Sequence, residues 1–487
     1  MSDHFNLTAH VLARAVDLED KSALQILKPS GAERWQYGRL LSAVRGAGAG
    51  FLAAGLMPGD RVLLRLGNTT DFPIAFLGAI AVGIIPVPTS AQLTGPEITK
   101  MAQQLDITAT VAQDGVALPD QPGILISTEE LRGFEALPPC DYAYGSSDRL
   151  AYIIFTSGSA GLPRAVCHAH RAILARHAMY DGWYGLRETD RLLHAGAFNW
   201  TYTLGTGLLD PWTMGATALI PSAAVRPDQI PLLLKRVDAT IFAAVPGVYR
   251  QILKAHSSLA LPKLRHGLSA GEKLPTALRS AWHDATGTPI HEAFGMSECS
   301  TFISGSPIRP SPEDTLGFIQ PDRKVRIAPQ GSDNDGEIQI HRDEPGLFLG
   351  YWGAKDETTA RFDGDWFRTG DMARMDAAGA VHYLGRNDDM MNAGGFRVSP
   401  IEVENALQHI DDIGDIAAIE VPVKPGVTVI ALAYSGGVDE TVLIAHAQET
   451  LARYKQPRIY RQILTLPRNA NGKIDRRKLR QDWAASH

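Results

Sequence analysis

The stretch YIIFTSGSAGLPRAVCHAH, residues 152–170, decides how the rest of this chain is interpreted. An apolar run that predicts a strand leads into small residues around Gly158 and Gly161, and Arg164 follows. Glycine tolerates positive φ, and successive N–H groups of such a loop point inward and form a nest for anions. Hydroxyl donors surround the glycines: Thr156, Ser157 and Ser159. On composition alone, a phosphate-binding loop and an ordinary surface loop are equally favoured.

Length and charge limit what the chain can be. A chain of 487 residues is too long to fold around one hydrophobic core of ordinary size, so we expect two or more domains. The net charge of -6, from 47 Lys and Arg against 53 Asp and Glu, gives no basic field for nucleic acid. Any anionic ligand must therefore be met by a local site.

Cysteine usage and hydropathy predict a cytoplasmic protein with no membrane partner. Cys140, Cys167 and Cys299 lack CxxC spacing, which argues against a disulfide framework and against structural zinc. The N-terminus has no apolar core typical of a signal peptide. The apolar run 72–88 is interrupted by prolines and is shorter than the roughly 20 residues that span a bilayer. We expect it to form a buried helix followed by a buried strand.

Short apolar runs alternate with helical patterns in the first third of the chain, which predicts βαβ units and a mostly parallel sheet. The expected strands are 61–66, 84–88, 109–113, 123–127 and 150–156. After about residue 320, glycine turns separate shorter runs, including GLFLGYW (346–352), and indicate a small antiparallel or barrel-like subdomain. The segment 385–400 reads as a linker, and the remainder returns to an α+β pattern.

Two further patterns are interpreted as packing. GAGAGF (46–51) fails GxGxxG and lies within a helical pattern, so close small-residue packing explains it better. Tyr180, Trp183 and Tyr184 are expected to pack in the core. A crowded group that could suggest a metal is assigned a non-metal role, because zinc needs convergent ligands: Cys167, His168, His170 and His177.

FTSGSAGLPRAV (155–166) resembles the TSGSTGxPKG signature of the adenylate-forming superfamily of acyl-CoA synthetases, adenylation domains and beetle luciferases. Further segments are similar to that family's motifs and follow in its order: AFGMSE (293–298), RTGD (368–371), GRNDDMMNAGGFRVSPIEVE (385–404) and NGKIDRRKL (471–479). The resemblance implies an α/β fold with a large N-terminal domain of doubly wound sheets (1–386). This domain includes a β subdomain at about 320–386, and a small mobile α+β domain follows (387–487).

The resemblance implies an enzyme that activates a carboxylate with ATP and transfers the acyl group to coenzyme A. The loop from Thr156 to Arg164 would hold phosphates. It departs from the family at Ala160 and at Arg164, and the lost hydroxyl is expected to weaken nucleotide binding without abolishing it. In AFGMSE, Phe294 would stack on adenine beside Gly295, Ser297 would donate to phosphate, and Glu298 would bind Mg²⁺. Taken alone, this segment also reads as a helix cap. SAGEKLP (269–275) carries over the segment that lines adenine: Gly271, Glu272 and Lys273.

The later motifs supply the ribose site and a hinge. Asp371 would accept from both ribose hydroxyls, reinforced by Arg386. Asp388 matches the pivot about which family members rotate the C-terminal domain between two catalytic faces. In one face Lys473 would balance the charge of carboxylate and α-phosphate. In the other, the thiol arm would enter past a glycine loop, with an arginine near phosphate: Gly394, Gly395 and Arg397.

The segments 197–211 and 243–253 match those that line the acyl pocket in the family. They offer apolar walls with a few polar groups: Asn199, Trp200, Tyr202, Val245 and Pro246. The first segment holds no acid before Asp210, which disfavours amino acids. SPIEVE and SAGEKLP resemble the benzoate-CoA ligase branch most closely, which favours an aryl or short acyl acid.

Several alternatives stay open at this point. They are a medium-chain fatty acid as substrate, a carrier protein as acceptor, a light-emitting oxidation, and a regulatory nucleotide-binding protein. The oligomeric state is left as monomer or homodimer. The context PRNANGK resembles the site at which family members are acetylated, so a protein acetyltransferase and deacetylase acting on Lys473 are expected partners.

Overall fold

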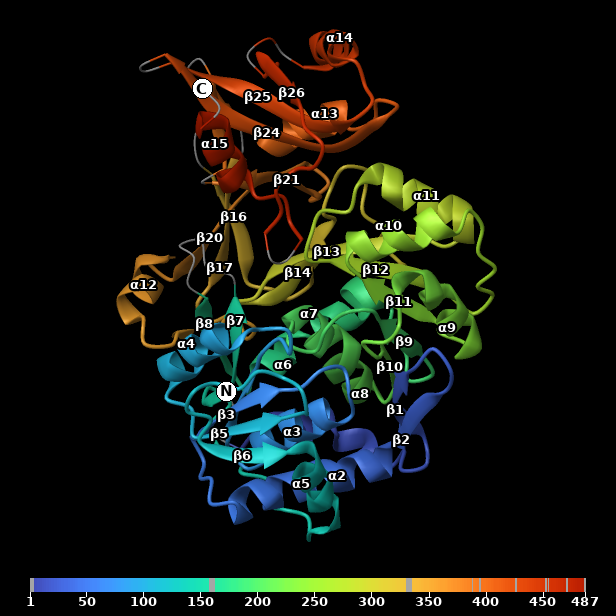
Figure 1. The fold of residues 1–487 in the computed structure, drawn as a ribbon, viewed down its shortest axis with the longest axis vertical. Coiled ribbons are helices and arrows are strands. Elements are labelled where there is room, and N and C mark those ends of the chain that lie inside the picture. Colours follow the sequence, from blue (N-terminus) through green and yellow to red (C-terminus); the bar gives the residue numbers. More distant parts are fainter. Residues whose placement is uncertain are drawn as a thin grey trace. The chain divides into compact units, whose positions relative to one another are not determined.

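The computed structural model describes residues 4–156, 163–329, 335–387, 389–393, 396–424, 427–451, 453, 455–469 and 472–485 (Figure 1). The chain divides into two compact units. Unit 1 comprises Met1–Lys324 and His341–Asp365, and unit 2 comprises Val325–Ile340 and Trp366–His487. The expected domain border at residue 386 stays a prediction.

Unit 1 contains a four-stranded parallel sheet near the N-terminus, as the alternating pattern predicts. Its order is β4 (Ile85–Pro88), β3 (Arg61–Arg65), β5 (Ala109–Ala112) and β6 (Ile124–Ser127). Helices cover both faces, which makes the sheet doubly wound: α2 (Tyr37–Ala53) and α3 (Asp71–Ala81) on one side and α4 (Gly95–Leu105) on the other. Successive residues of β3 alternate between the two cores because side chains of a strand point to opposite faces.

The run 72–88 forms the buried helix α3 and the buried strand β4, as expected. The glycines of GAGAGF lie in α2, where they allow close approach of a neighbouring segment. A Cβ on Gly46 would lie 2.3 Å from the carbonyl oxygen of Phe134, and one on Gly50 would lie 2.2 Å from the Phe134 ring. The small-residue packing interpretation is therefore confirmed.

A nine-stranded sheet forms the second layer of unit 1. Its six central strands are parallel, and its edge strands are antiparallel. In sheet order the strands are β15 (Phe318–Ile319), β14 (Ser300–Ser304), β13 (Ile290–Met296), β12 (His266–Ala270), β11 (Ile241–Ala244), β9 (Arg191–His194), β10 (Thr217–Pro221), β1 (Ser22–Leu27) and β2 (Ala32–Gln36). One face packs on α9 (Ile230–Arg236), α10 (Pro246–Ala255) and α11 (Thr276–Thr286).

Two expectations about strands are wrong. Residues 150–156 do form a strand, β7 (Leu150–Thr156), but it does not join the parallel sheet. It pairs antiparallel with β8 (Arg164–Ala169), because the chain turns straight back after the glycine-rich loop. GLFLGYW does not join the β subdomain either. Its strand β18 (Gly350–Tyr351) adds to β8 in the same three-stranded sheet.

Unit 2 contains the antiparallel strands expected after residue 320 and the α+β pattern after them. The first group is β16 (Val325–Pro329), β17 (Asp335–His341), β20 (Trp366–Met375) and β21 (Val381–Arg386). A short pair follows, β22 (Met391–Ala393) and β23 (Phe396–Val398), and then a sheet of β24 (Ile413–Lys424), β25 (Val427–Gly436) and β26 (Ile459–Gln462). Its helices are α13 (Pro400–Leu407), α14 (Glu440–Thr450) and α15 (Arg476–Ala485).

Both faces of the last sheet are buried. In β25, Ile430, Leu432 and Tyr434 join the core with α13 and α14, whereas Ala431 and Ala433 join the core with α15. The period of two in the strand therefore sorts large and small side chains between two layers. Within the described residues, no helix combines the length and the hydropathy needed to cross a bilayer.

Candidate active site

The glycine-rich loop is the connection of a β-hairpin. Thr156 at the end of β7 pairs with Arg164 at the start of β8, so the two flanks of the loop lie opposite each other. Thr156 and Arg164 are partly exposed at this end of the hairpin. The central loop residues lie outside the described part of the chain: Ser157, Gly158, Ser159, Ala160 and Gly161. Their predicted contacts with phosphate remain predictions.

Arg164 is linked to Glu298 through Tyr351. The guanidinium of Arg164 lies 5.3 Å from the centroid of the Tyr351 ring and forms an ion pair with Glu357 at 2.5 Å. The Tyr351 hydroxyl donates to Glu298 Oε1 at 2.6 Å. Burial, followed by the nearby carboxylate, raises the pKa of Tyr351, so the phenol remains a donor. Sequence reasoning missed both Tyr351 and Glu357, which come from β18 and from α12 (Lys355–Ala360).

Ser297 and Glu298 occupy a tight connection between β13 and β14. The Cys299 N–H donates to the Met296 carbonyl at 3.1 Å, and Ser300 takes a φ of +64°. The chain approaches itself so closely that a Cβ on Gly295 would lie 2.1 Å from the Ser300 carbonyl oxygen. Only glycine fits there. The helix-cap interpretation of this segment is therefore wrong, because the segment joins two antiparallel strands.

The surroundings of Glu298 fit a hard cation. Its side chain is buried at 8% exposure, and its backbone carbonyl accepts from Phe348 N–H at 2.8 Å. Within the described residues, the hydrogen bond to this carboxylate comes from Tyr351 and ends on Oε1, which leaves Oε2 for a ligand. Carboxylate oxygen is what Mg²⁺ prefers, and that ion usually keeps several waters when bound. Glu298 with Ser297 nearby is thus a suitable Mg²⁺ and phosphate position.

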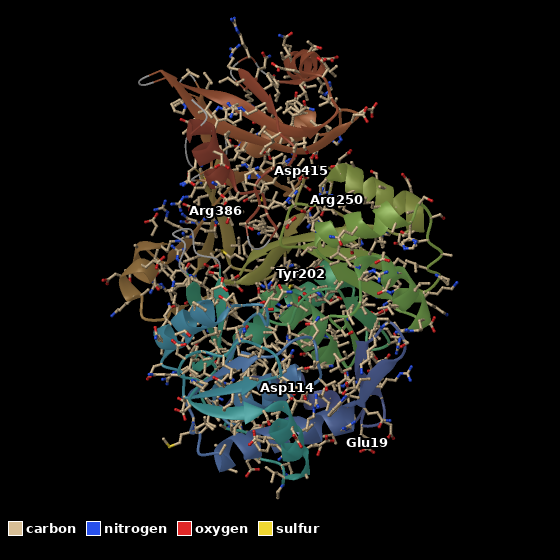
Figure 2. All side chains as sticks on the ribbon, in the orientation of Figure 1. Glu19, Asp114, Tyr202, Arg250, Arg386 and Asp415 are labelled. Atoms are coloured by element: carbon tan, nitrogen blue, oxygen red, sulfur yellow. The ribbon has the colours of Figure 1, made fainter. Side chains whose placement is uncertain are left out.

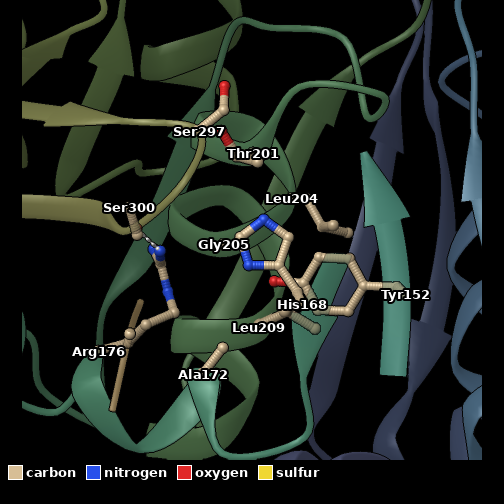
Figure 3. A pocket seen from close by; sticks show the side chains of 11 residues that line it. Tyr152, His168, Ala172, Arg176, Thr201, Leu204, Gly205, Leu209, Ser297 and Ser300 are labelled. Carbon is tan, nitrogen blue, oxygen red and sulfur yellow. Dashed lines mark hydrogen bonds between the residues drawn. The ribbon is translucent and has the colours of Figure 1, made fainter. Parts of the chain in front are cut away.

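A small cavity of about 20 Å³, with polar and apolar side chains in its lining, lies next to this connection (Figure 3). Ser297, Ser300, Arg176, His168 and Tyr152 contribute to its lining, and the volume suits about one water molecule. His168 stacks on Tyr152 with ring centroids 4.8 Å apart, and burial lowers the pKa of His168 to about 4. The cavity therefore holds a neutral imidazole next to the Ser297–Glu298 segment.

The remaining residues of the crowded Cys/His group have packing or hydrogen-bonding roles. Cys167 is buried, and the His170 Nδ1 accepts from the Leu7 N–H at 3.0 Å. His177 Nε2 lies 3.1 Å from His10 Nε2. In the part of the chain that the structure describes, no three metal-ligating side chains gather at one place. Trp183 and Tyr184 are fully buried, which confirms their assignment to the core.

The predicted adenine segment follows β12 directly. Gly271 has a φ of +92°, and Glu272 and Lys273 are partly exposed beyond it. Glu292 of β13 anchors this segment, because its carboxylate accepts from Leu274 N–H at 2.8 Å and from Arg279 at 3.1 Å. Burial raises the pKa of Glu292 to about 7, and these two donors offset part of that rise. Two residues after Glu292 on β13, Phe294 packs edge-on against Phe302 of β14 with ring centroids 5.6 Å apart.

Two of the residues predicted to line the acyl pocket, Val245 and Tyr202, lie close to β12 and the segment after it. A Cβ on Gly271 would lie 3.8 Å from Val245, and Val245 and Pro246 begin α10. Tyr202 of α7 (Thr201–Leu204), labelled in Figure 2, donates to the Leu268 carbonyl of β12 at 3.2 Å. Its ring stacks on Trp183 at 5.8 Å and meets His194 edge-on at 4.3 Å. Asn199 is partly exposed and Trp200 is 38% exposed at the start of α7.

Asp210, the first acid after that segment, is already neutralised. Its carboxylate accepts two hydrogen bonds from Arg176, at 2.7 and 2.6 Å, and both side chains are buried. Tyr184 donates to the same carboxylate at 2.6 Å. Arg176 also donates to the Ser300 hydroxyl. Asp210 therefore has a structural role and is not presented to a ligand.

In unit 2, Asp371 is held from both sides. Tyr383 donates to Oδ1 at 2.8 Å and Arg386 to Oδ2 at 3.2 Å, and the carboxylate is almost fully buried. The antiparallel register of β20 and β21 places Asp371 opposite Arg386, which is labelled in Figure 2. A carboxylate accepts hydrogen bonds on both oxygens, which is the chemistry that the two hydroxyls of a ribose require. Sequence reasoning found Asp371 and Arg386 but missed Tyr383.

The structure describes only part of the segments that contain the predicted hinge and the predicted thiol loop. Asp388, Gly394 and Gly395 lie outside the described residues, and for Arg397 only the backbone is described, in β23 opposite Asn392. Lys473 is exposed on a turn just before α15. Its N–H donates to Asn469 Oδ1 at 3.1 Å, and its carbonyl accepts from Asn469 N–H at 2.8 Å.

Comparison with known proteins gives matches over nearly the whole chain. The model of the "AMP-binding enzyme" family matches residues 12–352, and that of the "AMP-binding enzyme C-terminal domain" matches residues 402–473. Benzoate–CoA ligase of Thauera aromatica is 32% identical, over 88% of this chain and 86% of that protein. Acyl-coenzyme A synthetase ACSM2 of Rattus norvegicus is 29% identical, over 99% of this chain and 92% of that protein.

A solved structure gives the same result. The benzoate CoA ligase of Burkholderia xenovorans LB400 superposes with a TM-score of 0.83 at 26% identity, and the match covers 98% of this chain and 100% of that one.

Proposed function

The chain belongs to the family of AMP-binding enzymes, and from this membership we propose that it joins an aryl or short acyl carboxylate to coenzyme A at the expense of ATP. Within the family it is an adenylate-forming acid:CoA ligase. In the first step a carboxylate oxygen bonds to the α-phosphorus and pyrophosphate leaves. In the second step the thiol sulfur bonds to the acyl carbon, its proton is lost, and AMP leaves.

The proposed roles follow from the local geometry. Arg164 and the loop before it meet the phosphates, and Ser297 donates to phosphate. Glu298 holds Mg²⁺, which supplies positive charge to the phosphate oxygens when bound. Phe294 and the segment from Gly271 to Lys273 take the adenine. Asp371, pre-oriented by Tyr383 and Arg386, accepts from the ribose hydroxyls.

The acid proposed rests on the aromatic wall around Tyr202. Trp183 and His194 hold that ring in place, and flat walls of this kind suit a flat acid. Asp210 is committed to Arg176, so the pocket segment offers no carboxylate to pair with the ammonium of an amino acid. The similarity to a protein named benzoate–CoA ligase supports the same choice.

A medium-chain fatty acid is the second candidate, and the similarity to an acyl-coenzyme A synthetase of the rat favours it. Free coenzyme A is the proposed acceptor, with a discrete carrier protein as the alternative. We also propose the cytoplasm as location and a monomer or homodimer as the working form.

The C-terminal domain is proposed to present two faces in turn. Lys473 serves the first face, where it balances the charge that gathers at the α-phosphate. Gly394, Gly395 and Arg397 serve the second, after rotation at Asp388. Acetylation of Lys473 would remove its charge and stop the first step. Intact-mass analysis of Lys473 peptides from native cells tests this regulation, and peptides without acylation would rule it out.

A carboxylate panel tests the proposed function directly. Pyrophosphate release is measured with Mg²⁺, ATP and coenzyme A for benzoate, 3-hydroxybenzoate, butyrate and octanoate. We expect the two benzoates to give the highest kcat/KM. Preference for octanoate would favour the second candidate, and release that needs no added thiol but yields no acyl-CoA would point to a carrier protein. No acyl-adenylate from any acid would contradict the proposal.

A further inference from the structure

Helix α15 begins three residues after Lys473, so whatever fixes this helix also fixes the lysine. The turn before α15 is closed by backbone bonds: Asn469 N–H to the Lys473 carbonyl at 2.8 Å and Asp475 N–H to the Pro467 carbonyl at 2.8 Å. Lys478 N–H donates to Asp475 Oδ1 at 2.9 Å at the start of the helix. The lysine turn and α15 therefore form one continuous local structure.

Arg476, the first residue of α15, is anchored to α13. Its Nη2 donates to both oxygens of Glu404, at 2.6 and 2.7 Å, and the two side chains are only 15% and 10% exposed. Glu404 also accepts from the Ala418 N–H of β24 at 2.8 Å. Burial raises the pKa of Glu404, and the guanidinium offsets part of that rise. This pair joins the helix to the core of unit 2.

Arg480 lies one helical turn later on the same face of α15, since residues four apart are neighbours on a helix. Its Nη2 contacts Asp389 twice, at 3.2 Å to Oδ1 and 3.5 Å to the backbone carbonyl. Asp389 directly follows the proposed pivot, and its N–H donates to the Arg386 carbonyl at 3.1 Å. The second arginine of the face therefore holds the chain at the point where the hinge ends.

We propose that these two pairs, Arg476–Glu404 and Arg480–Asp389, form a clamp that fixes the Lys473 turn to the segment after the hinge. Rotation at the hinge then carries the lysine as part of a rigid body. Arg480 is accordingly a positioning residue for the first step, acting through Lys473. This inference rests on the role of Lys473 in the proposed function.

Apolar packing and the Arg476–Glu404 pair both hold α15 in the fold, so the Arg480–Asp389 half of the clamp can be tested without unfolding the helix. Leu479 and Trp483 are buried against Ala417, Ile419 and their neighbours in β24 and β25. Arg480 and Asp389 are 31% and 27% exposed, and such partly exposed pairs contribute little to stability. Loss of this pair should therefore change where the lysine turn sits and leave the fold intact.

The test compares the two half-reactions in the full-length enzyme. Adenylation is measured as ATP–pyrophosphate exchange with the best acid of the panel above, and thioester formation is measured from its synthetic acyl-adenylate and coenzyme A. We expect Arg480→Ala to slow adenylation about tenfold and thioester formation less than twofold, because small misplacements of a catalytic group are costly. Arg480→Lys should restore most of the lost rate.

Lys478→Ala is the matched control. Lys478 lies on the opposite side of the same helix and pairs with Asp482 at 2.7 Å, with both side chains about half exposed. In the Lys478→Ala variant, the rates of both half-reactions should stay within twofold of the wild-type rates. The melting temperature of every variant should stay within about 2 °C of that of the wild type. Equal slowing of both half-reactions by Arg480→Ala, no slowing at all, or equal effects of Lys478→Ala would overturn the clamp.

Lys473→Ala in the same assay separates this inference from its premise. If Lys473→Ala leaves adenylation intact, the proposed role of the lysine fails, and the clamp fails with it. If Lys473→Ala stops adenylation while Arg480→Ala does not slow it, the clamp alone is wrong.

Discussion

Glu298 in unit 1 and Asp371 in unit 2 are both buried carboxylates at proposed nucleotide positions, but their surroundings differ. Asp371 has a donor on each oxygen, from Tyr383 and from Arg386. Glu298 is met on one oxygen by the neutral phenol of Tyr351. The first arrangement fixes a carboxylate in one orientation. The second keeps an oxygen and the negative charge available.

This difference matches what each ligand requires. Ribose hydroxyls are neutral and directional, so a pre-oriented acceptor gains most from fixed geometry. A divalent cation needs uncompensated negative charge, and a nearby guanidinium would compete with it. At the Glu298 end, Arg164, whose guanidinium lies over the Tyr351 ring, is paired instead with Glu357. In the proposed function, the two regions would thus separate recognition by hydrogen bonds from recognition by charge.

The largest effect is expected from Glu298→Gln. The amide keeps the shape but loses the charge, so adenylation should fall about a thousandfold, in line with the loss of a group that stabilises transition-state charge. The measurement is kcat for ATP–pyrophosphate exchange over a series of Mg²⁺ concentrations. Glu313→Gln, an exposed position, serves as control. A rate within tenfold of the wild type would show that this carboxylate does not carry the cation.

Asp371→Asn should have a somewhat smaller effect than Glu298→Gln, and it should weaken the binding of ATP. An amide nitrogen cannot accept from a ribose hydroxyl, and hydrogen bonds to a charged group are worth about 1.5–3 kcal/mol each. We expect KM for ATP to rise about a hundredfold. The sharper readout is 3′-deoxyATP, which should be a poor substrate for the wild type and nearly equal to ATP for the variant. Undiminished discrimination in the variant would place the ribose elsewhere.

The sequence was sufficient to predict the candidate site residues that lie in the motifs shared with the family. Asp371 and Arg386 stand opposite each other because a glycine-containing turn at 376–379 joins two antiparallel strands, and that register also brings Tyr383 to Asp371. Tyr383 could have been inferred from the same hairpin. The helix α3 and the strand β4 were predictable for a similar local reason, since apolar continuity of that length implies burial.

The partners of Glu298 and Arg164 were not predictable from local patterns. Tyr351 reaches Glu298 because the two-residue strand β18 adds to β8, more than 180 residues earlier in the chain. Glu357 then follows on the next helix. Strand pairing over such a separation leaves no periodic signal in the sequence. The antiparallel pairing of β7 escaped prediction for the same reason, because an apolar run does not specify its partner.

Glu292 is a third buried carboxyl group, and it sharpens the comparison. It has a cation partner, Arg279, but burial still raises its pKa from 4.5 to about 7. The folded state therefore binds more protons than the unfolded state between pH 4.5 and about 7, and stability falls as pH rises through this window. We expect a loss of about 2 kcal/mol between pH 5 and pH 7. Chemical denaturation at several pH values measures it, and Glu292→Gln should remove this part of the slope. A wild type and variant with parallel profiles would contradict the assignment.

The smallest effect is expected from a change beside Arg164. The two arginines at the proposed nucleotide positions, Arg164 and Arg386, differ in the carboxylate with which each one pairs. Arg386 pairs with the proposed ribose ligand, whereas Arg164 pairs with Glu357, which lies outside the proposed ligand set. If Arg164 meets phosphate as proposed, we expect Glu357 to compete with the phosphate for the guanidinium. Both side chains are about one third exposed, at 28% and 39%, so the pair is worth no more than about 1 kcal/mol. Glu357→Gln should lower KM for ATP two- to threefold, with Asp356→Asn on the same helix as control. If KM rises instead, Glu357 orients Arg164 for the phosphates and does not compete with them.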